Sequence, residues 1–138
     1  MTLPPTALDT LLRSIDPVLN PGTYAFVSVT DADALASVEI FASVREPEGL
    51  SAVIAEPDAV ALGVAVLFRA AWITLRVQSD LHAVGLTAAF SGALASAGIG
   101  CNVVAGAWHD HVFVPAERAA DAMAVLRRLQ GGEGSRDS

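Results

Sequence analysis

Cysteine and basic residues are scarce in this chain, and each scarcity excludes a class of protein. The 138 residues include one cysteine, Cys101, so no internal disulfide can form, and nothing else indicates an oxidising compartment. The eight Lys and Arg residues are outnumbered by fifteen Asp and Glu residues, which gives a net charge of −7. Only Arg127 and Arg128 form a basic cluster, so we expect no nucleic-acid partner.

Long apolar helices and targeting signals are also missing. Residues 59–68 are uninterrupted apolar, but Gly63 and Arg69 divide the longer stretch that continues to Leu75. A membrane-spanning helix needs about 20 apolar residues with few or no charges. The N-terminus has no basic segment followed by an apolar one, unlike a signal peptide. We therefore expect a cytoplasmic protein with no membrane partner.

The segment from Trp72 to Pro115 carries the clearest pattern. Apolar and polar residues alternate over 73–78, which predicts a strand, and helical spacing follows from Leu86 to Ala97. Gly98 stands where that helix would end. Residues 102–105 and 112–114 are short apolar runs that predict two strands, and residues 117–129 predict a last helix. The order β-α-β-β-α is that of a ferredoxin-like unit.

The first part of the chain predicts a second, degenerate unit of related order. We expect a helix over 3–15, strands over 23–29, 38–44 and 50–55, and a short helix over 57–62. The sequence therefore predicts an α+β fold with an antiparallel sheet and helices on one face. We divide the chain into a degenerate half at 1–65, a fuller half at 66–130 and a disordered tail at 131–138.

Several segments together resemble the ACT domain family, whose members are small regulatory modules that bind amino acids. The resemblance is greatest to small bacterial proteins with two ACT-like halves, and extends to the cytosolic arginine sensors of animals. It implies the βαββαβ-type ACT fold, an amino-acid effector, no cofactor, a homodimer and a possible protein partner. The segments that carry it are 21–24 (PGTY), 45–50 (REPEGL), 79–89 (SDLHAVGLTAA), 98–104 (GIGCNVV) and 109–114 (HDHVFV).

The loop that leads into the second-half helix is the candidate ligand site. A helix N-terminus offers unpaired N–H groups and a partial positive charge, and Gly85 has no side chain to keep a carboxylate away. The alternative is that Gly85 only permits the helix to pack closely against the sheet. The resemblance favours a site, and it adds the first strand after the helix. The expected ligand-binding residues are Leu81, His82, Ala83, Val84, Gly85, Leu86, Thr87, Asn102, Val103 and Asp110.

Three other groups of residues leave alternatives open. Asn102 either forms a hydrogen bond with a ligand or makes a structural hydrogen bond in an apolar strand. His109, Asp110 and His111, with His82, could form a metal or enzymatic centre, a capped turn or the wall of an effector site. We expect no metal and no catalytic residue, because neither a Cys-x-x-Cys motif, a nucleophile elbow nor a phosphate loop occurs.

The first-half turn at 45–49 carries Glu46 and Glu48, which either form a solvated turn or act as paired carboxylates. The expected function is that of an amino-acid-binding regulatory protein without its own catalytic domain. The two alternatives are a small enzyme or metal protein, and an assembly module that binds no ligand.

Overall fold

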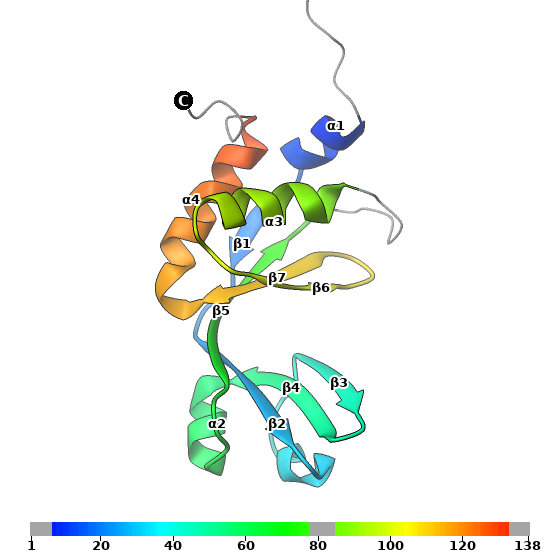
Figure 1. The fold of residues 1–138 in the computed structure, drawn as a ribbon, viewed down its shortest axis with the longest axis vertical. Helices are drawn as coiled ribbons and strands as arrows, with labels where there is room; N and C mark the ends of the chain where they lie inside the picture. The colour runs from blue at the N-terminus through cyan, green and yellow to red at the C-terminus, as the bar shows by residue number, and fades with distance from the viewer. Residues whose placement is uncertain (1–6, 78–84, 133–138) are drawn as a thin grey trace, which may run out of the picture.

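The computed structural model describes residues 7–77 and 85–132, and within them the chain folds as an α+β protein with tandem units (Figure 1). Seven strands form one antiparallel sheet in the order β3-β4-β2-β5-β7-β6, and β1 also pairs with β5. The helices and strands are α1 (Ala7–Arg13), β1 (Pro17–Leu19), β2 (Tyr24–Val29), η1 (Ala32–Leu35), β3 (Ala42–Glu46), β4 (Gly49–Ala55), α2 (Glu56–Leu62), β5 (Phe68–Leu75), α3 (Leu86–Ser96), β6 (Asn102–Ala105), β7 (Asp110–Pro115), η2 (Ala116–Arg118) and α4 (Ala119–Gln130).

The elements with clear periodicity form where the sequence predicts them. The strand predicted at 50–55 is β4, the helix at 57–62 is α2, and the last helix is α4. Gly98 has φ 75° directly after α3, so it takes the left-handed conformation that ends a helix. Pro57 lies in the first turn of α2, where its missing N–H removes no hydrogen bond.

In the first part of the chain, one predicted strand has a different start and one strand was missed. The strand predicted over 38–44 begins at Ala42, because residues up to Phe41 follow the 3₁₀ helix η1 in turns and bends. Asp31 caps η1 by accepting a hydrogen bond from the Asp33 N–H. The three-residue strand β1 was not predicted, because three residues are too few to show a period of two.

The strand β5 belongs to both halves of the sheet. Its first residues, Phe68–Ala70, pair with β2, and its last residues, Ile73–Leu75, pair with β1 on the same side. On its other side β7 runs alongside residues 70–75. The two halves are therefore joined by continuous backbone hydrogen bonds.

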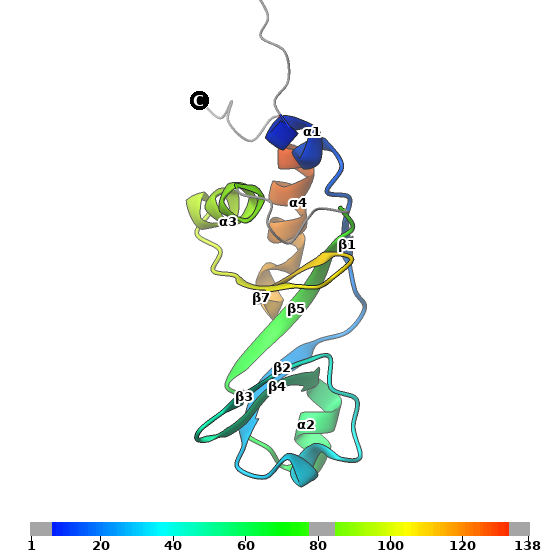
Figure 2. The ribbon, with the colours of Figure 1, turned by 90° about the vertical axis from the view of Figure 1, so that its right-hand side faces the viewer.

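One face of the sheet is covered by all the helices. Figures 1 and 2 show α1, α3 and α4 together at one end of the molecule and α2 at the other. The first group buries a core that includes Ile73, Leu75, Phe90 and Leu126, and the second buries Val27 and Ile54. This arrangement confirms the prediction of helices on one face.

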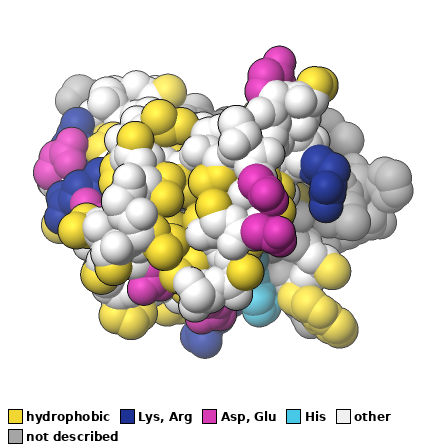
Figure 3. Space-filling view, turned by 90° about the horizontal axis from the view of Figure 1, so that it is seen from below, with side chains coloured by type: hydrophobic (Ala, Val, Ile, Leu, Met, Phe, Trp, Pro, Cys, Tyr) yellow, Lys and Arg dark blue, Asp and Glu magenta, His cyan; other side chains and the backbone are white. Residues whose placement is uncertain are grey.

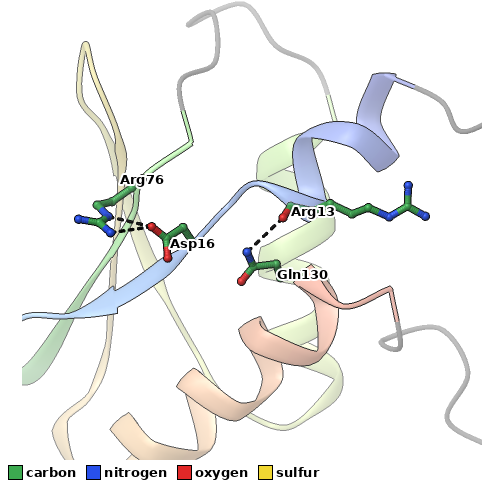
Figure 4. Close-up of polar contacts among 4 residues, drawn as sticks. All are labelled: Arg13, Asp16, Arg76 and Gln130. Atoms are coloured by element: carbon green, nitrogen blue, oxygen red, sulfur yellow. Dashed lines mark hydrogen bonds and ion pairs between the residues drawn. The ribbon is translucent and has the colours of Figure 1, made fainter.

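The N-terminal segment packs against the second half in space. Gln130, at the end of α4, donates a hydrogen bond to the backbone carbonyl of Arg13 at 3.1 Å (Figure 4). Leu8 and Leu12 pack on the core under α3 and α4. The strand β1 thus completes the second unit in the order β1-β5-β7-β6, although it precedes the first unit in the chain.

Candidate functional site

The helix α3 begins at Gly85, which the sequence singled out. Gly85 is the N-cap residue with φ 96°, a conformation that residues with a side chain rarely adopt. Gly85 has no side chain to cap the helix, and among the described residues no side chain accepts from the first N–H groups of α3. Leu86 is buried at 2% exposure, whereas Thr87 is exposed. The four residues Leu81, His82, Ala83 and Val84 lie outside the described residues.

Asp110 lies at the same end of the second unit. It starts β7 opposite Leu75, the last residue of β5, and the chain passes from β5 to α3 within ten residues. Residues opposite each other in a ladder share a face, so Asp110 lies on the helix-covered face with Leu75. Leu75 and Leu86 belong to one core cluster. Asp110 therefore faces the layer in which α3 begins.

Asp110 is a buried residue whose carboxylate forms no ion pair with the other described residues. The residue is 9% exposed, and among the described residues it forms no side-chain hydrogen bond or ion pair. Burial raises the pKa of this carboxyl above its ordinary value, and the neighbouring His111 opposes that effect. A buried carboxylate is normally paired, so this one is suited to a cationic ligand group.

The edge strand β6 places its two candidate residues on opposite faces. Val103 is half-buried against the helix-side core, in register with Val112. Asn102 is exposed on the open face, in register with Phe113. The structure therefore brings Gly85, Leu86, Val103 and Asp110 to one face of the sheet and leaves Asn102 on the other.

The two histidines of the β6–β7 hairpin, which flank Asp110 in the sequence, lie in different environments. His109 lies in the turn, and its buried Nδ1 has no hydrogen-bond partner among the described residues. His111 lies on the open face, where its Nδ1 is 3.1 Å from Nε1 of Trp72. In the ranges 7–77 and 85–132 no group of three His, Cys, Asp or Glu residues could hold a metal ion. His82 lies outside those ranges.

The open face carries an aromatic cluster that sequence reasoning missed. Alternate residues of β2 and β5 point to this face, and the strands bring their rings to centroid distances of 5.2–5.9 Å. The period of two in both strands was the available signal, but only the pairing of the strands shows that the rings meet. The cluster consists of Tyr24, Phe26, Phe41, Phe68, Trp72, His111 and Phe113.

Away from the α3 end, described residues line two hollows. An apolar one of about 260 Å³ opens on the open face between the halves, lined by Phe26, Val44 and Phe68 with Val104 of β6. A polar one of about 260 Å³ lies between Thr30 and the β3–β4 hairpin. Both Glu46 and Glu48 line it, and Glu46 accepts a hydrogen bond from the Ser51 hydroxyl.

The face of the molecule seen from below mixes basic and hydrophobic side chains. Figure 3 shows basic side chains in separate places, with hydrophobic side chains across the middle of the face seen from below. Within the described part of the chain, no helix is long and apolar enough to cross a membrane. Cys101 is half-buried, and burial raises the pKa of its thiol, which disfavours a nucleophilic role.

Two family models match the chain one after the other. Both are described as the ACT domain, and they match residues 5–71 and 68–128. The models meet on β5, the strand that the two halves of the sheet share. No curated protein sequence matches the chain.

Solved structures share the fold over most of the chain. A Vibrio cholerae protein of unknown function, described as a possible transport protein, is 42% identical with a TM-score of 0.82, covering 90% of this chain and 96% of its own. The regulatory subunit of aspartate kinase from Thermus flavus is 14% identical with a TM-score of 0.58, covering 82% and 95%. The corresponding Thermus thermophilus subunit, in a ligand-free form, is 15% identical with a TM-score of 0.62, covering 84% and 97%.

Proposed function

Because the chain belongs to the ACT domain family, with two such domains in tandem, we propose that it is a regulatory protein whose effector is an amino acid. Structures of the same fold include regulatory subunits of aspartate kinase, which supports a regulatory role. The observation that carries the proposal is the position of Asp110, a buried acidic residue without an ion pair among the described residues, at the end of the unit where α3 begins.

The two charged groups of an α-amino acid complement the acidic residue and the helix N-terminus of this site. Its ammonium group would pair with Asp110, which has no cationic partner among the described residues. Its carboxylate would accept hydrogen bonds from the first N–H groups of α3, where Gly85 leaves the backbone uncovered. Of the described residues, Leu86, Thr87 and Val103 would form the walls. A nucleotide or sugar phosphate lacks the cationic group that Asp110 requires.

The response would reach another molecule through the packing of the chain. Binding orders the α3 end and favours one arrangement of the two halves, because a ligand stabilises whichever state it binds more tightly. The output then passes to a partner protein or to the association of two chains through an exposed sheet edge. We propose that this occurs in the cytoplasm, without a cofactor and without catalysis by this chain.

A thermal-shift screen of the common amino acids, followed by calorimetry, tests the proposal. A ligand at 100 times its Kd adds about 2.7 kcal/mol to the unfolding free energy. ATP and glucose 6-phosphate serve as competing chemical classes. Asp110→Asn should abolish the response, whereas Asp121→Asn, at an exposed acidic residue of α4, should preserve it.

The competing functions give different results in the same screen. Stabilisation by ATP or glucose 6-phosphate alone contradicts the amino-acid assignment. Stabilisation by zinc, lost on replacement of His109, would indicate a metal protein. No response to any small molecule, together with a stable dimer, would leave the assembly module as the function.

A further inference from the structure

Trp72 lies where the two halves of the sheet meet. On β5 it separates the residues that pair with β2 from those that pair with β1. The link between β1 and β2 is fixed at the same point, because Asn20 donates to the Trp72 carbonyl from its backbone N–H at 2.9 Å and from its side-chain amide at 3.1 Å. A displacement of Trp72 would therefore act on both halves.

The indole ring of Trp72 contacts side chains from each half. From the first half, Tyr24 and Phe41 have ring centroids 5.3 Å and 5.2 Å away. From the second half, Phe113 lies at 5.9 Å and His111 at 5.6 Å. The ring is thus packed between the halves on the open face.

Hydrogen bonds determine which nitrogen of His111 carries a proton. The Trp72 indole N–H can only donate, and it lies 3.1 Å from Nδ1 of His111. The Thr74 hydroxyl oxygen lies 3.3 Å from the same nitrogen and already accepts from Asn20 at 2.9 Å. The Trp72 N–H decides the role of Nδ1: because this N–H can only donate, Nδ1 must accept, and the proton of neutral His111 lies on Nε2.

We propose that His111 is a proton-operated latch on the junction of the two ACT domains. Neutral His111 accepts from Trp72 and holds the indole between the halves. Protonation places a hydrogen on Nδ1, where it opposes the indole N–H, so this hydrogen bond breaks and the packing around Trp72 loosens. The latch lies on the opposite face of the sheet from the amino-acid site, and the two are linked only by the charge of Asp110, which neighbours His111 on β7.

Few charges surround the latch. The neighbours on β5 and β6, Trp72, Thr74 and Val104, do not titrate at moderate pH, and neither does Asn20. Among the described residues, the charged groups that act on it electrostatically are His109 and Asp110. Burial lowers the pKa of His111, His109 lowers it further, and Asp110 raises it.

The lowered pKa of His111 in the folded state determines how the stability of the fold changes with pH. The unfolded chain binds a proton at a pKa of about 6.5, above that of the folded state. The latch therefore stabilises the fold fully above about pH 6.5, and its contribution falls as the pH drops towards the folded pKa.

Tryptophan fluorescence in the Trp108→Phe background tests the latch, because Trp108 is 71% exposed at the hairpin turn and would otherwise add its own signal. Between about pH 8 and pH 5 the emission of Trp72 should shift reversibly with a midpoint below about 6.5. His111→Gln should remove the transition, since a glutamine oxygen accepts from the indole and does not titrate. The matched control His109→Gln should keep it, with a midpoint moved to higher pH.

Amide exchange and imidazole NMR complete the test. Peptides covering 68–72 should exchange faster in the parent chain than in His111→Gln at the same acidic pH, and equally at pH 8. In the parent chain, imidazole nitrogen shifts should show the Nε2–H form of His111. A Nδ1–H form, a transition that survives His111→Gln, or one abolished by His109→Gln would each overturn the proposal. The NMR measurement needs no variant, so it decides the matter even if His111→Gln does not fold.

Discussion

Arg76 donates two hydrogen bonds to one carboxylate oxygen of Asp16, at 3.0 Å from Nε and 2.7 Å from Nη2 (Figure 4). The pair joins the residue before β1 to the residue after β5, which are 60 positions apart. Both side chains are more than half exposed, so the ion pair itself contributes about 1 kcal/mol or less.

Two substitutions at Asp16 distinguish the contribution of its charge to stability from that of its backbone conformation. Its φ is 41°, a left-handed value that Asn tolerates and β-branched residues do not. Asp16→Asn should lower the unfolding free energy by about 1 kcal/mol or less. Asp16→Val should cost about 1–2 kcal/mol more, because of backbone strain. Urea unfolding measures both, and equal losses for the two variants would contradict the role of the backbone.

Gly49 should tolerate no side chain. Its φ is 147°, and a Cβ atom there would lie 2.2 Å from the carbonyl oxygen of Val29. Gly49→Ala must therefore push the β3–β4 hairpin away from β2, at a cost above about 3 kcal/mol. Gly22→Ala is the control, because Gly22 also has a positive φ but open space around it. Similar unfolding midpoints for the two variants would show that the close contact is unimportant.

Gly85 should matter more for the effector than for the fold. A Cβ there would meet Leu8 at 3.5 Å, an ordinary contact, so the main cost of Gly85→Ala is the positive φ, about 1–2 kcal/mol. Gly85→Val should in addition cover the first N–H groups of α3 and abolish effector binding. Calorimetry with the amino acid found in the screen decides this. Intact binding in a folded Gly85→Val chain would place the ligand elsewhere.

Asp110 should make the ligand-free protein less stable at neutral pH. Because burial raises its folded pKa, the folded state loses stability as the pH rises from about 3.9 through the folded pKa. Asp110→Asn should therefore raise the melting temperature at pH 7 by a few degrees, for about 1 kcal/mol, while it removes effector binding. Calorimetric melting from about pH 4 to pH 7 should show the gain growing with pH. A loss of stability at pH 7 would indicate a partner for the carboxylate.

Asn102 tests which face the effector uses. It was predicted to bind the effector, and its replacement would then cost about 1–3 kcal/mol of binding free energy. In the structure it lies on the open face, exposed on the edge strand β6. For a site under α3 within one chain, Asn102→Ala should change the Kd less than about threefold. A larger loss, measured below and above the concentration at which chains associate, would show that the ligand or a second chain reaches the β6 edge.

Local sequence was sufficient for the elements with strong periodicity and marked ends. The residues of α3 repeat at helical spacing and end at Gly98, and the β6–β7 strands are bounded by Gly100, Gly106 and Pro115. The segments that carry the family resemblance also lie within short windows. The fold class and the family followed from these windows, because side-chain period and turn conformation are set by neighbours in the chain.

Contacts between distant residues were decided only by the tertiary structure. No window shows that β1 joins the second unit, that β5 serves both halves, or that Trp72 meets His111 on the open face. The same holds for Asp110, whose burial depends on its register with Leu75 and on the helices above it. Periodicity gives the faces of each strand, but which faces meet is fixed by pairing between residues tens of positions apart, and that pairing depends on the free energy of the whole core.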